Sequence, residues 1–200
     1  MRIGHGFDSH EFKLGVPLRI GGIDVAYDRG LAGHSDGDVL LHALTDALLG
    51  AVAAGDIGAF FPPSDPKWKG ANSALFVEEA VNQVRRAGYM VANVDSTLIL
   101  QKPKIGPHAA AIRVRIAEML GIDVSCVSVK AKTPEGLNLP DTAAAHVVVL
   151  LQAHGDEKER VLQTAEALPQ TVVDAAVEET LEKSGPAKVR EPKKVVDSPK

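Results

Sequence analysis

The chain has one cysteine, Cys126, among its 200 residues, and only 4% of its residues are aromatic. A single thiol cannot form an internal disulfide, so the sequence excludes a disulfide-stabilised fold and is typical of a reducing compartment. The net charge is −4, and no basic patch interleaved with aromatic residues occurs before residue 180. A nucleic acid is therefore not an expected partner.

Long apolar segments are also missing. The longest apolar-rich run, residues 39–55, is interrupted by His42 and Asp46 and is shorter than the roughly 20 residues that cross a bilayer. The N-terminus, MRIGHGFD, has neither the apolar segment nor the small-residue cleavage site of a signal peptide. We therefore expect no membrane partner and, by default, a cytoplasmic location.

Hydrophobic residues make up 45% of the chain, enough for one domain with a substantial core. Their periodicity predicts strands over 2–12, 90–101, 126–132 and 143–152, and a hairpin that turns at Gly21-Gly22. It predicts helices over about 36–54, 73–87 and 107–120. Ser35 or Asp36 would cap the first helix and Gly55 would end it. The pattern predicts an α+β (α/β-like) fold, a mixed β-sheet covered by helices on one face.

The composition changes after Gln152. Residues 153–183 are charged and compatible with a helix, whereas residues 184–200 contain three prolines and mostly polar side chains, which is typical of disorder. We therefore predict one domain over residues 1–152, a charged extension over 153–183 and a disordered tail over 184–200. The extension and tail are expected to have no catalytic role.

The segment DSH, residues 8–10, predicts one half of a metal site. Side chains two apart on a strand share a face, so Asp8 and His10 project together, and His5 falls on the opposite face with Phe7. A carboxylate oxygen and an imidazole nitrogen are both ligands that zinc takes. A third ligand must come from another part of the chain.

The first predicted helix offers that ligand. Asp38, His42 and Asp46 recur every four positions and form a polar stripe on an otherwise apolar surface, so His42 would face water or a site. Three protein ligands and one open position are the arrangement of a catalytic zinc. Spacing alone leaves an alternative open, in which His10 lies on a strand edge and His42 is hydrogen-bonded at a helix surface.

Two short segments around this helix predict contacts with an anion and with hydroxyl groups. His34 and Ser35 directly precede the helix, where free N–H groups and the positive end of the helix dipole would favour an anion. Asp56, between two glycines in AGDIG, could accept hydrogen bonds from hydroxyl groups, or it could be an exposed residue at the end of the helix.

Two further loops carry groups that suit a phosphate. Lys102 and Lys104 follow a strand in a stiff basic loop, and Lys132, Thr133 and Glu135 follow another. A lysine and a threonine hydroxyl could bind phosphate, and the carboxylate could hold magnesium against it. The sequence contains no G-x-S-x-G elbow and no P-loop, and its cysteine is expected in an apolar strand. The chemistry therefore favours metals and phosphate-binding groups over a protein nucleophile.

Four segments together resemble the 2-C-methyl-D-erythritol 2,4-cyclodiphosphate synthase family. They are RIGHGFDSH, GGIDVAYDRGLAGHSDGDVLLHALTDALLGAVAAGDIGAFFP, GYMVANVDSTLILQKPKIGPH and VSVKAKTPEGL, and the resemblance runs from residue 1 to about 151. It implies an enzyme of the non-mevalonate isoprenoid pathway that cyclises 4-diphosphocytidyl-2-C-methyl-D-erythritol 2-phosphate and releases CMP. It also implies a homotrimer with active sites between neighbouring subunits.

The resemblance implies roles for residues by their position in these segments. Asp8, His10 and His42 would hold zinc, and Glu135 would hold magnesium (or manganese) on the diphosphate. His34 and Thr133 would stabilise the transition state. The implied substrate-binding residues are Asp8, Ser9, His10, His34, Ser35, Asp56, Ile57, Gly58, Phe61, Ser64, Asp65, Leu100, Lys102, Pro103, Lys104, Ile105, Gly106, Ala131, Lys132, Thr133 and Glu135. Within this set, Asp56–Gly58 would bind the erythritol part and Leu100–Gly106 the cytidine.

The chain departs from the family pattern in three places. Pro63 replaces a usual Asp, and Lys132 stands where Thr is common. The segment over 138–146 replaces a glycine-rich stretch whose arginine, in relatives, lines a cavity on the trimer axis. We therefore expect weak or no binding of an isoprenoid diphosphate at that axis. The chain starts at the cyclase motif, so the stand-alone form of the enzyme is expected.

Two other functions agree with parts of this pattern. A catalytically inactive, trimeric zinc-containing binding protein would explain the departures at Pro63 and residues 132–142. A zinc-dependent phosphoesterase would use the same metal and phosphate groups but would give open-chain hydrolysis products.

Overall fold

The computed structural model describes residues 1–135 and 141–155, and Met1–His154 form one compact unit. The expectations for the extension and the tail beyond Gly155, and for residues 138–140 of the altered segment, lie outside the described residues. No helix within the described ranges is long and apolar enough to cross a membrane.

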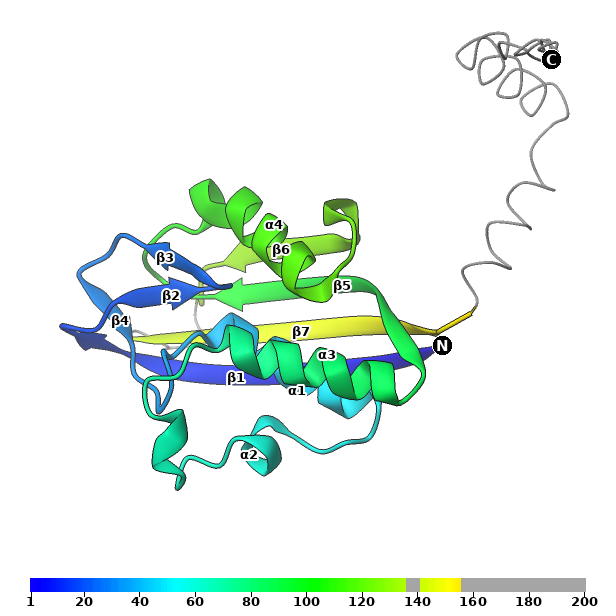
Figure 1. Ribbon diagram of the computed structural model, residues 1–200. Coiled ribbons are helices and arrows are strands. Elements are labelled where there is room, and N and C mark those ends of the chain that lie inside the picture. The colour runs from blue at the N-terminus through cyan, green and yellow to red at the C-terminus, as the bar shows by residue number, and fades with distance from the viewer. Residues whose placement is uncertain (136–140, 156–200) are drawn as a thin grey trace, which may run out of the picture. The chain divides into compact units, whose positions relative to one another are not determined.

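A five-stranded mixed sheet with the order β4-β1-β7-β5-β6 forms the centre of this unit (Figure 1). Its strands are β1 (Arg2–Leu14), β4 (Arg29–Leu31), β5 (Tyr89–Ile99), β6 (Val127–Lys132) and β7 (Thr142–Ala153). Strands β5 and β6 pair parallel, and the other three pairings in this sheet are antiparallel. Strands β2 (Leu18–Ile20) and β3 (Ile23–Val25) form the predicted hairpin, with its turn at Gly21-Gly22. The predicted mixed sheet is confirmed.

Helices α1, α3 and α4 lie on one face of this sheet (Figure 1). The helices are α1 (Val39–Ala51), α2 (Ile57–Phe60), α3 (Ala74–Arg86) and α4 (Ala109–Leu120), with 3-10 turns η1 (Pro66–Trp68), η2 (Gly106–His108) and η3 (Val124–Cys126). Helix α1 is buried nearly all round because it packs between β1, β7 and α3. Helix α4 ends as predicted at Gly121, which adopts the left-handed conformation that glycine favours.

Two glycines let α1 pack directly on β1. A Cβ atom built on Gly4 would lie 1.9 Å from the carbonyl oxygen of Ala47, and one built on Gly6 would lie 1.9 Å from that of Ala43. Any larger residue would therefore collide with the helix backbone rather than with a movable side chain. This close approach brings His42, one position before Ala43, to the strand that carries Asp8 and His10.

The predicted ends of the first helix were wrong. Its N-cap is Asp38, whose carboxylate accepts the Leu41 N–H at 3.1 Å, and not Ser35 or Asp36. The same carboxylate accepts the N–H groups of Gly21 and Gly22 at 2.9 and 2.7 Å, so a contact with the distant hairpin selects this cap. The helix ends at Ala51, ahead of the predicted stop at Gly55.

Smaller corrections concern the loops and the cysteine. Helix α2 and turn η1 have no periodic signal in the sequence, because each is only one turn long. Cys126 ends η3 and precedes β6, so it is not in the predicted strand.

The face of the sheet opposite α1 is open in the single chain. Side chains along β1 alternate, so Gly4 and Gly6 are buried under α1 while Ile3 and Phe7 project to the other side. On that side Ile3 is 71% exposed, Phe7 50% and Val148 of β7 42%. An apolar sheet face of this kind is typical of a surface that associates with another chain.

Candidate metal and substrate site

Asp8, His10 and His42 converge on one point between β1 and α1. Their ligand atoms form a nearly equilateral triangle: His10 Nε2 to Asp8 Oδ2 is 2.9 Å, His42 Nδ1 to Asp8 Oδ2 is 3.0 Å, and His10 Nε2 to His42 Nδ1 is 3.0 Å. This is the only cluster of three or more His, Cys, Asp or Glu side chains with such geometry in the described part of the chain. The structure therefore brings His10 and His42 together with Asp8, which is the arrangement that the metal-site interpretation requires.

The triangle has the composition and size of a divalent-metal site. Zinc with bonds of about 2.0–2.1 Å in tetrahedral geometry separates its ligand atoms by about 3.3 Å, so the three atoms need to spread by only a few tenths of an ångström. The site is partly accessible, since the side chains of Asp8, His10 and His42 are 26%, 18% and 10% exposed. A fourth coordination position can therefore be reached from solvent. The residues fit a metal ion.

Interactions within the cluster shift the pKa of Asp8 and the pKa of His10 in opposite directions. Burial alone would raise the pKa of Asp8, but hydrogen bonds and charges of His10 and His42 lower that pKa well below its usual range. Burial alone would lower the pKa of His10, but the hydrogen bond and the charge of Asp8 raise it above the ordinary value. Asp8 is thus a carboxylate across the working pH range, the form that binds metal.

The other nitrogen of His42 contacts two serines. His42 Nε2 lies 2.9 Å from Ser35 Oγ and 2.9 Å from Ser73 Oγ. Ser73 Oγ donates to Asp36 Oδ1 at 2.5 Å, and the Ser73 N–H donates to Asp36 Oδ2 at 3.1 Å. Because the Ser73 hydroxyl donates its hydrogen bond to the Asp36 carboxylate, Ser73 Oγ can accept a hydrogen bond from the Nε2–H of His42. The Nδ1 lone pair of His42 then points at Asp8 and His10.

Sequence reasoning missed Ser73, and it considered Asp36 only as a helix cap. Ser73 is fully buried at the start of α3, on a helix that has no sequence link to the first. The available signal was weak, because a serine that directly precedes an amphipathic helix, as Ser73 does, is ordinarily explained as a helix cap. Here its side chain makes no capping hydrogen bond and contacts the His42 ring instead.

The polar stripe predicted on α1 has three separate roles. Asp38 is fully buried and holds the hairpin and the helix start together. His42 contributes to the metal cluster. Asp46 accepts the Ile57 N–H at 2.8 Å and so fixes the beginning of α2. His42 thus faces the site, as predicted, whereas the Asp38 carboxylate is satisfied within the core.

His34 and Ser35 lie beside the metal cluster, although not at the helix terminus. Asp38 caps α1, so a carboxylate of the chain itself lies at the positive end of the helix. Ser35 approaches the cluster through its hydroxyl on His42. His34 is exposed, and its carbonyl accepts the Gly70 N–H at 2.8 Å.

The residues predicted to bind the erythritol part lie on one connected loop. Asp56 is exposed and caps α2 by accepting the Ala59 N–H at 2.9 Å, and Ile57 and Gly58 form the first turn of that helix. Phe61 stacks on Phe76 at 4.3 Å between ring centroids, and the Phe76 ring lies 6.0 Å from that of His42.

The end of this loop carries two predicted substrate-binding residues, Ser64 and Asp65, and Pro63, which departs from the family pattern. Asp65 caps η1 by accepting the Lys67 N–H at 3.0 Å. Ser64 and Pro63 are exposed. An aromatic cluster thus links the loop to the metal ligands, with its polar residues open to solvent.

The residues predicted for the nucleotide line a separate cavity of about 340 Å³. The predicted residues that line it are Leu100, Pro103, Lys104, Ile105, Gly106, Ala131, Lys132 and Thr133. Lys102 is exposed next to it, and Glu135, at positive φ, accepts a hydrogen bond from the Thr133 hydroxyl. The structure therefore brings two loops, more than twenty residues apart in sequence, to one pocket.

Within one chain, the metal ligands on β1 and the nucleotide-pocket residues on β6 lie at the same level of the sheet but on different strands. Register pairs Ser9 of β1 with Ala144 of β7, Ala144 with Ile99 of β5, and Ile99 with Lys132 of β6. Three strand spacings separate Ser9 from Lys132, about 14 Å.

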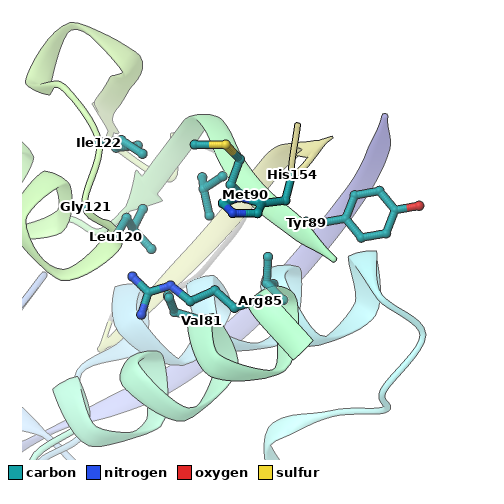
Figure 2. A pocket seen from close by; sticks show the side chains of 10 residues that line it. Val81, Arg85, Tyr89, Met90, Leu120, Gly121, Ile122 and His154 are labelled. Carbon is teal, nitrogen blue, oxygen red and sulfur yellow. The ribbon is translucent and has the colours of Figure 1, made fainter. Parts of the chain in front are cut away.

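A second cavity, of about 350 Å³, lies at the other end of β5 (Figure 2). It is lined mainly by apolar side chains of α3, β5 and α4, together with Arg85 and His154. None of the predicted site residues lines it, so it does not belong to the metal and nucleotide region.

Comparison with known proteins identifies close relatives over the same residues. The family model described as the YgbB family matches residues 1–152. The chain is 68% identical over 152 residues, 76% of its length, to a protein from Koribacter versatilis (strain Ellin345) named 2-C-methyl-D-erythritol 2,4-cyclodiphosphate synthase, of which it covers 98%. It is 55% identical over 153 residues, 75% of its length, to the chloroplastic protein of that name from Arabidopsis thaliana, of which it covers 66%.

Solved structures with the same name share the fold. One matches 76% of this chain and 100% of its own with a TM-score of 0.72 and 42% identity. Another, solved in a CDP-bound form, gives a TM-score of 0.72 at 40% identity with the same coverage.

Proposed function

The chain belongs to the YgbB family, and from this membership and its site we propose how it acts as a 2-C-methyl-D-erythritol 2,4-cyclodiphosphate synthase. It is a lyase of the non-mevalonate isoprenoid pathway, which converts 4-diphosphocytidyl-2-C-methyl-D-erythritol 2-phosphate to 2-C-methyl-D-erythritol 2,4-cyclodiphosphate and CMP. The observation that carries this function is the Asp8, His10 and His42 cluster in a chain that covers 98% of its 68%-identical relative.

The reaction needs positioning and charge neutralisation more than a protein nucleophile. An oxygen of the substrate's 2-phosphate forms a bond to the β-phosphorus, and the bond from that phosphorus to the oxygen it shares with the α-phosphate breaks. The released oxygen leaves as part of CMP. Both the nucleophile and the leaving group are phosphate oxygens of one molecule, so the protein has to fold the substrate and stabilise negative charge.

Asp8, His10 and His42 would hold zinc, the ion that two imidazoles and a carboxylate favour. Bound there, zinc would supply Lewis-acid stabilisation of a β-phosphate oxygen in its open position. Ser35 is placed to hydrogen-bond the same phosphate because its hydroxyl lies beside the cluster, and His34 is exposed next to it. We assign His34 to transition-state stabilisation.

The cavity at β5 and β6 would bind the cytidine end of the substrate. Lys104 and Lys132 line it and supply positive charge for the α-phosphate, and Thr133 stands at its edge to stabilise the transition state. Glu135 would hold magnesium (or manganese), which would supply charge neutralisation for the phosphates. Asp56, Ile57 and Gly58, on the loop connected to His42 by aromatic contacts, would bind the erythritol part.

A homotrimer would complete this site between subunits. The open sheet face, with Ile3, Phe7 and Val148 exposed, supports association of copies of the chain through this face. The separation of about 14 Å between the strands of the metal ligands and of the nucleotide pocket supports a site to which a neighbouring subunit contributes. We assign the enzyme to the cytoplasm, and its domain to residues 1–152.

Phosphorus-31 NMR tests the reaction directly. Purified protein with zinc and magnesium is expected to convert the diphosphocytidyl substrate to the cyclic diphosphate and CMP. Open-chain phosphate products would instead indicate a phosphoesterase. An unchanged substrate spectrum with substrate bound would indicate an inactive binding protein.

Replacing Ser73 with alanine is expected to weaken zinc binding. Ser73 relays the hydrogen bond from Asp36 to His42 Nε2, and losing such a support for a ligand typically costs roughly 10–100-fold in metal affinity. Competition with a chromophoric chelator measures the affinity, and nitrogen-15 NMR of the metal-free protein reports the proton on Nε2 of His42. Ser125→Ala, an exposed serine in η3, is the control. Equal affinities of the Ser73 and Ser125 variants would rule out this role.

A further inference from the structure

Two histidines that the reaction does not use meet on the open face of the sheet. His5 of β1 and His146 of β7 are 141 residues apart in sequence, yet His5 Nε2 lies 3.3 Å from His146 Nδ1. Their ring centroids are 5.6 Å apart, and the rings are tilted by 31°. Both side chains are exposed.

The sheet and a neighbouring ring hold this pair in place. Phe7 is the direct cross-strand partner of His146, and its ring centroid lies 4.8 Å from that of His146. His5 is the partner of Val148, so the two histidines are diagonal neighbours on adjacent strands. The positions of both rings are therefore set by antiparallel register rather than by a loop.

The separation of the two nitrogens suits a shared metal ion. Two imidazole nitrogens bound at about 2.0–2.1 Å to a tetrahedral ion lie about 3.3 Å apart, and at a right angle about 2.9 Å apart. A direct N–H···N hydrogen bond would usually be shorter than the observed 3.3 Å. Neutral imidazole is the commonest protein ligand for zinc and its neighbours in the periodic table.

The neighbours of the pair on β5 and β6 do not oppose a cation. Lys130, on β6 and two strands away from β7, is paired with Asp95 at 2.5 Å. Thr97, the cross-strand partner of His146 on β5, is uncharged. In one chain, the remaining positions of an ion held by the two imidazoles would lie on the open side of the sheet, the side through which we propose that copies of the chain associate.

We propose that His5 and His146 form a second metal site, which binds a divalent transition-metal ion such as zinc. This site is separate from the cluster of Asp8, His10 and His42. Alternation along β1 turns His5 to the face opposite Asp8 and His10, so one ion cannot reach both sets. Both proposed ligands come from one chain, and the site does not rest on the proposed reaction.

Titration of the metal-free protein with zinc alone tests the proposal. Calorimetry of the full chain is expected to show a tight step for the Asp8, His10 and His42 cluster and a second, weaker step. Replacing His5 or His146 with alanine turns a two-ligand site into a single imidazole. The second step is then expected to weaken by roughly 10²-fold or more, while the tight step is unchanged.

Two comparisons keep the result specific. His154→Ala, which removes an exposed histidine at the end of β7, should leave both steps intact. Cyclisation should proceed normally in the His5 and His146 variants, so failure of this proposal is distinguishable from failure of the proposed function. The two histidines lie on different strands, so each variant changes a different strand. Either variant is enough for the test if circular dichroism shows that it is folded. A wild-type protein without the second step, or a second step that persists in a folded variant, would show that the pair is only hydrogen-bonded.

Discussion

Replacing His42 with alanine is expected to remove tight zinc binding and to lower turnover by at least about 10³-fold, since loss of a single charge-stabilising group at a phosphate or oxyanion already costs about 10²–10³. His42 is the ligand that connects α1 to the two ligands on β1, and its Nδ1 lies 3.0 Å from both partner atoms. Without it, Asp8 and His10 offer only two ligands, whereas a catalytic zinc site has three protein ligands and one open position. The zinc content after dialysis measures metal binding, and phosphorus-31 NMR measures turnover.

The matched variants separate loss of the metal from loss of the fold. His42→Gln keeps most of the side-chain volume and can still hydrogen-bond Ser35 and Ser73 through its side-chain amide, but it offers no imidazole. It should fold and still lose zinc. His154→Ala should retain zinc and full turnover. Zinc retained at wild-type affinity in both His42 variants would mean that the cluster is not the metal site.

Replacing Gly6 with alanine is expected to destabilise the domain by about 3 kcal/mol or more, because overpacking against an immovable group typically costs 1–3 kcal/mol and sometimes exceeds it. The added Cβ would lie 1.9 Å from the Ala43 carbonyl oxygen, so α1 would have to move away from β1. For a domain of this size a loss of this order lowers the melting temperature by roughly 6–12 °C. Chemical and thermal unfolding measure both quantities.

The displacement of α1 should also appear at the site. His42 lies next to Ala43, so moving the helix separates His42 from Asp8 and His10 and should weaken zinc binding in the variant that remains folded. Gly50→Ala is the control: Gly50 lies within α1 and a Cβ there meets no atom within 4 Å. That change should be neutral or stabilising by about 0.5–1 kcal/mol, as expected for alanine in place of glycine in a helix. Equal stability of the Gly6 and Gly50 variants would contradict the role of Gly6.

Local sequence patterns were enough for most of the elements. Alternation along RIGHGFDSHEF predicts a strand with Asp8 and His10 on one face and His5 on the other, and β1 has this arrangement. The 3.6-residue period places His42 on a helix, and Gly121 ends α4 as expected. Both patterns depend on the direction of side chains within one element. That direction follows from the position of a residue along a strand or helix, so it can be predicted from the sequence.

The ends of elements and the partners of polar groups depend on contacts between segments that are distant in the sequence. Asp38 rather than Ser35 or Asp36 caps α1 because the Gly21 and Gly22 N–H groups lie within reach of its carboxylate. Ser73 supports His42 because α3 packs on α1, which nothing in the sequence near either residue indicates. These hydrogen bonds join segments that are far apart in the chain, so no local period reports them.

By itself, then, the sequence determined which residues are available as ligands and which face of a strand or helix each one occupies. Only the tertiary structure decided that they meet: Gly4 and Gly6 let α1 contact β1 closely enough for His42 to join Asp8 and His10, and antiparallel register places His5 beside His146. The physical reason is that direction within an element follows from backbone geometry, whereas a contact between elements depends on how closely their backbones can pack.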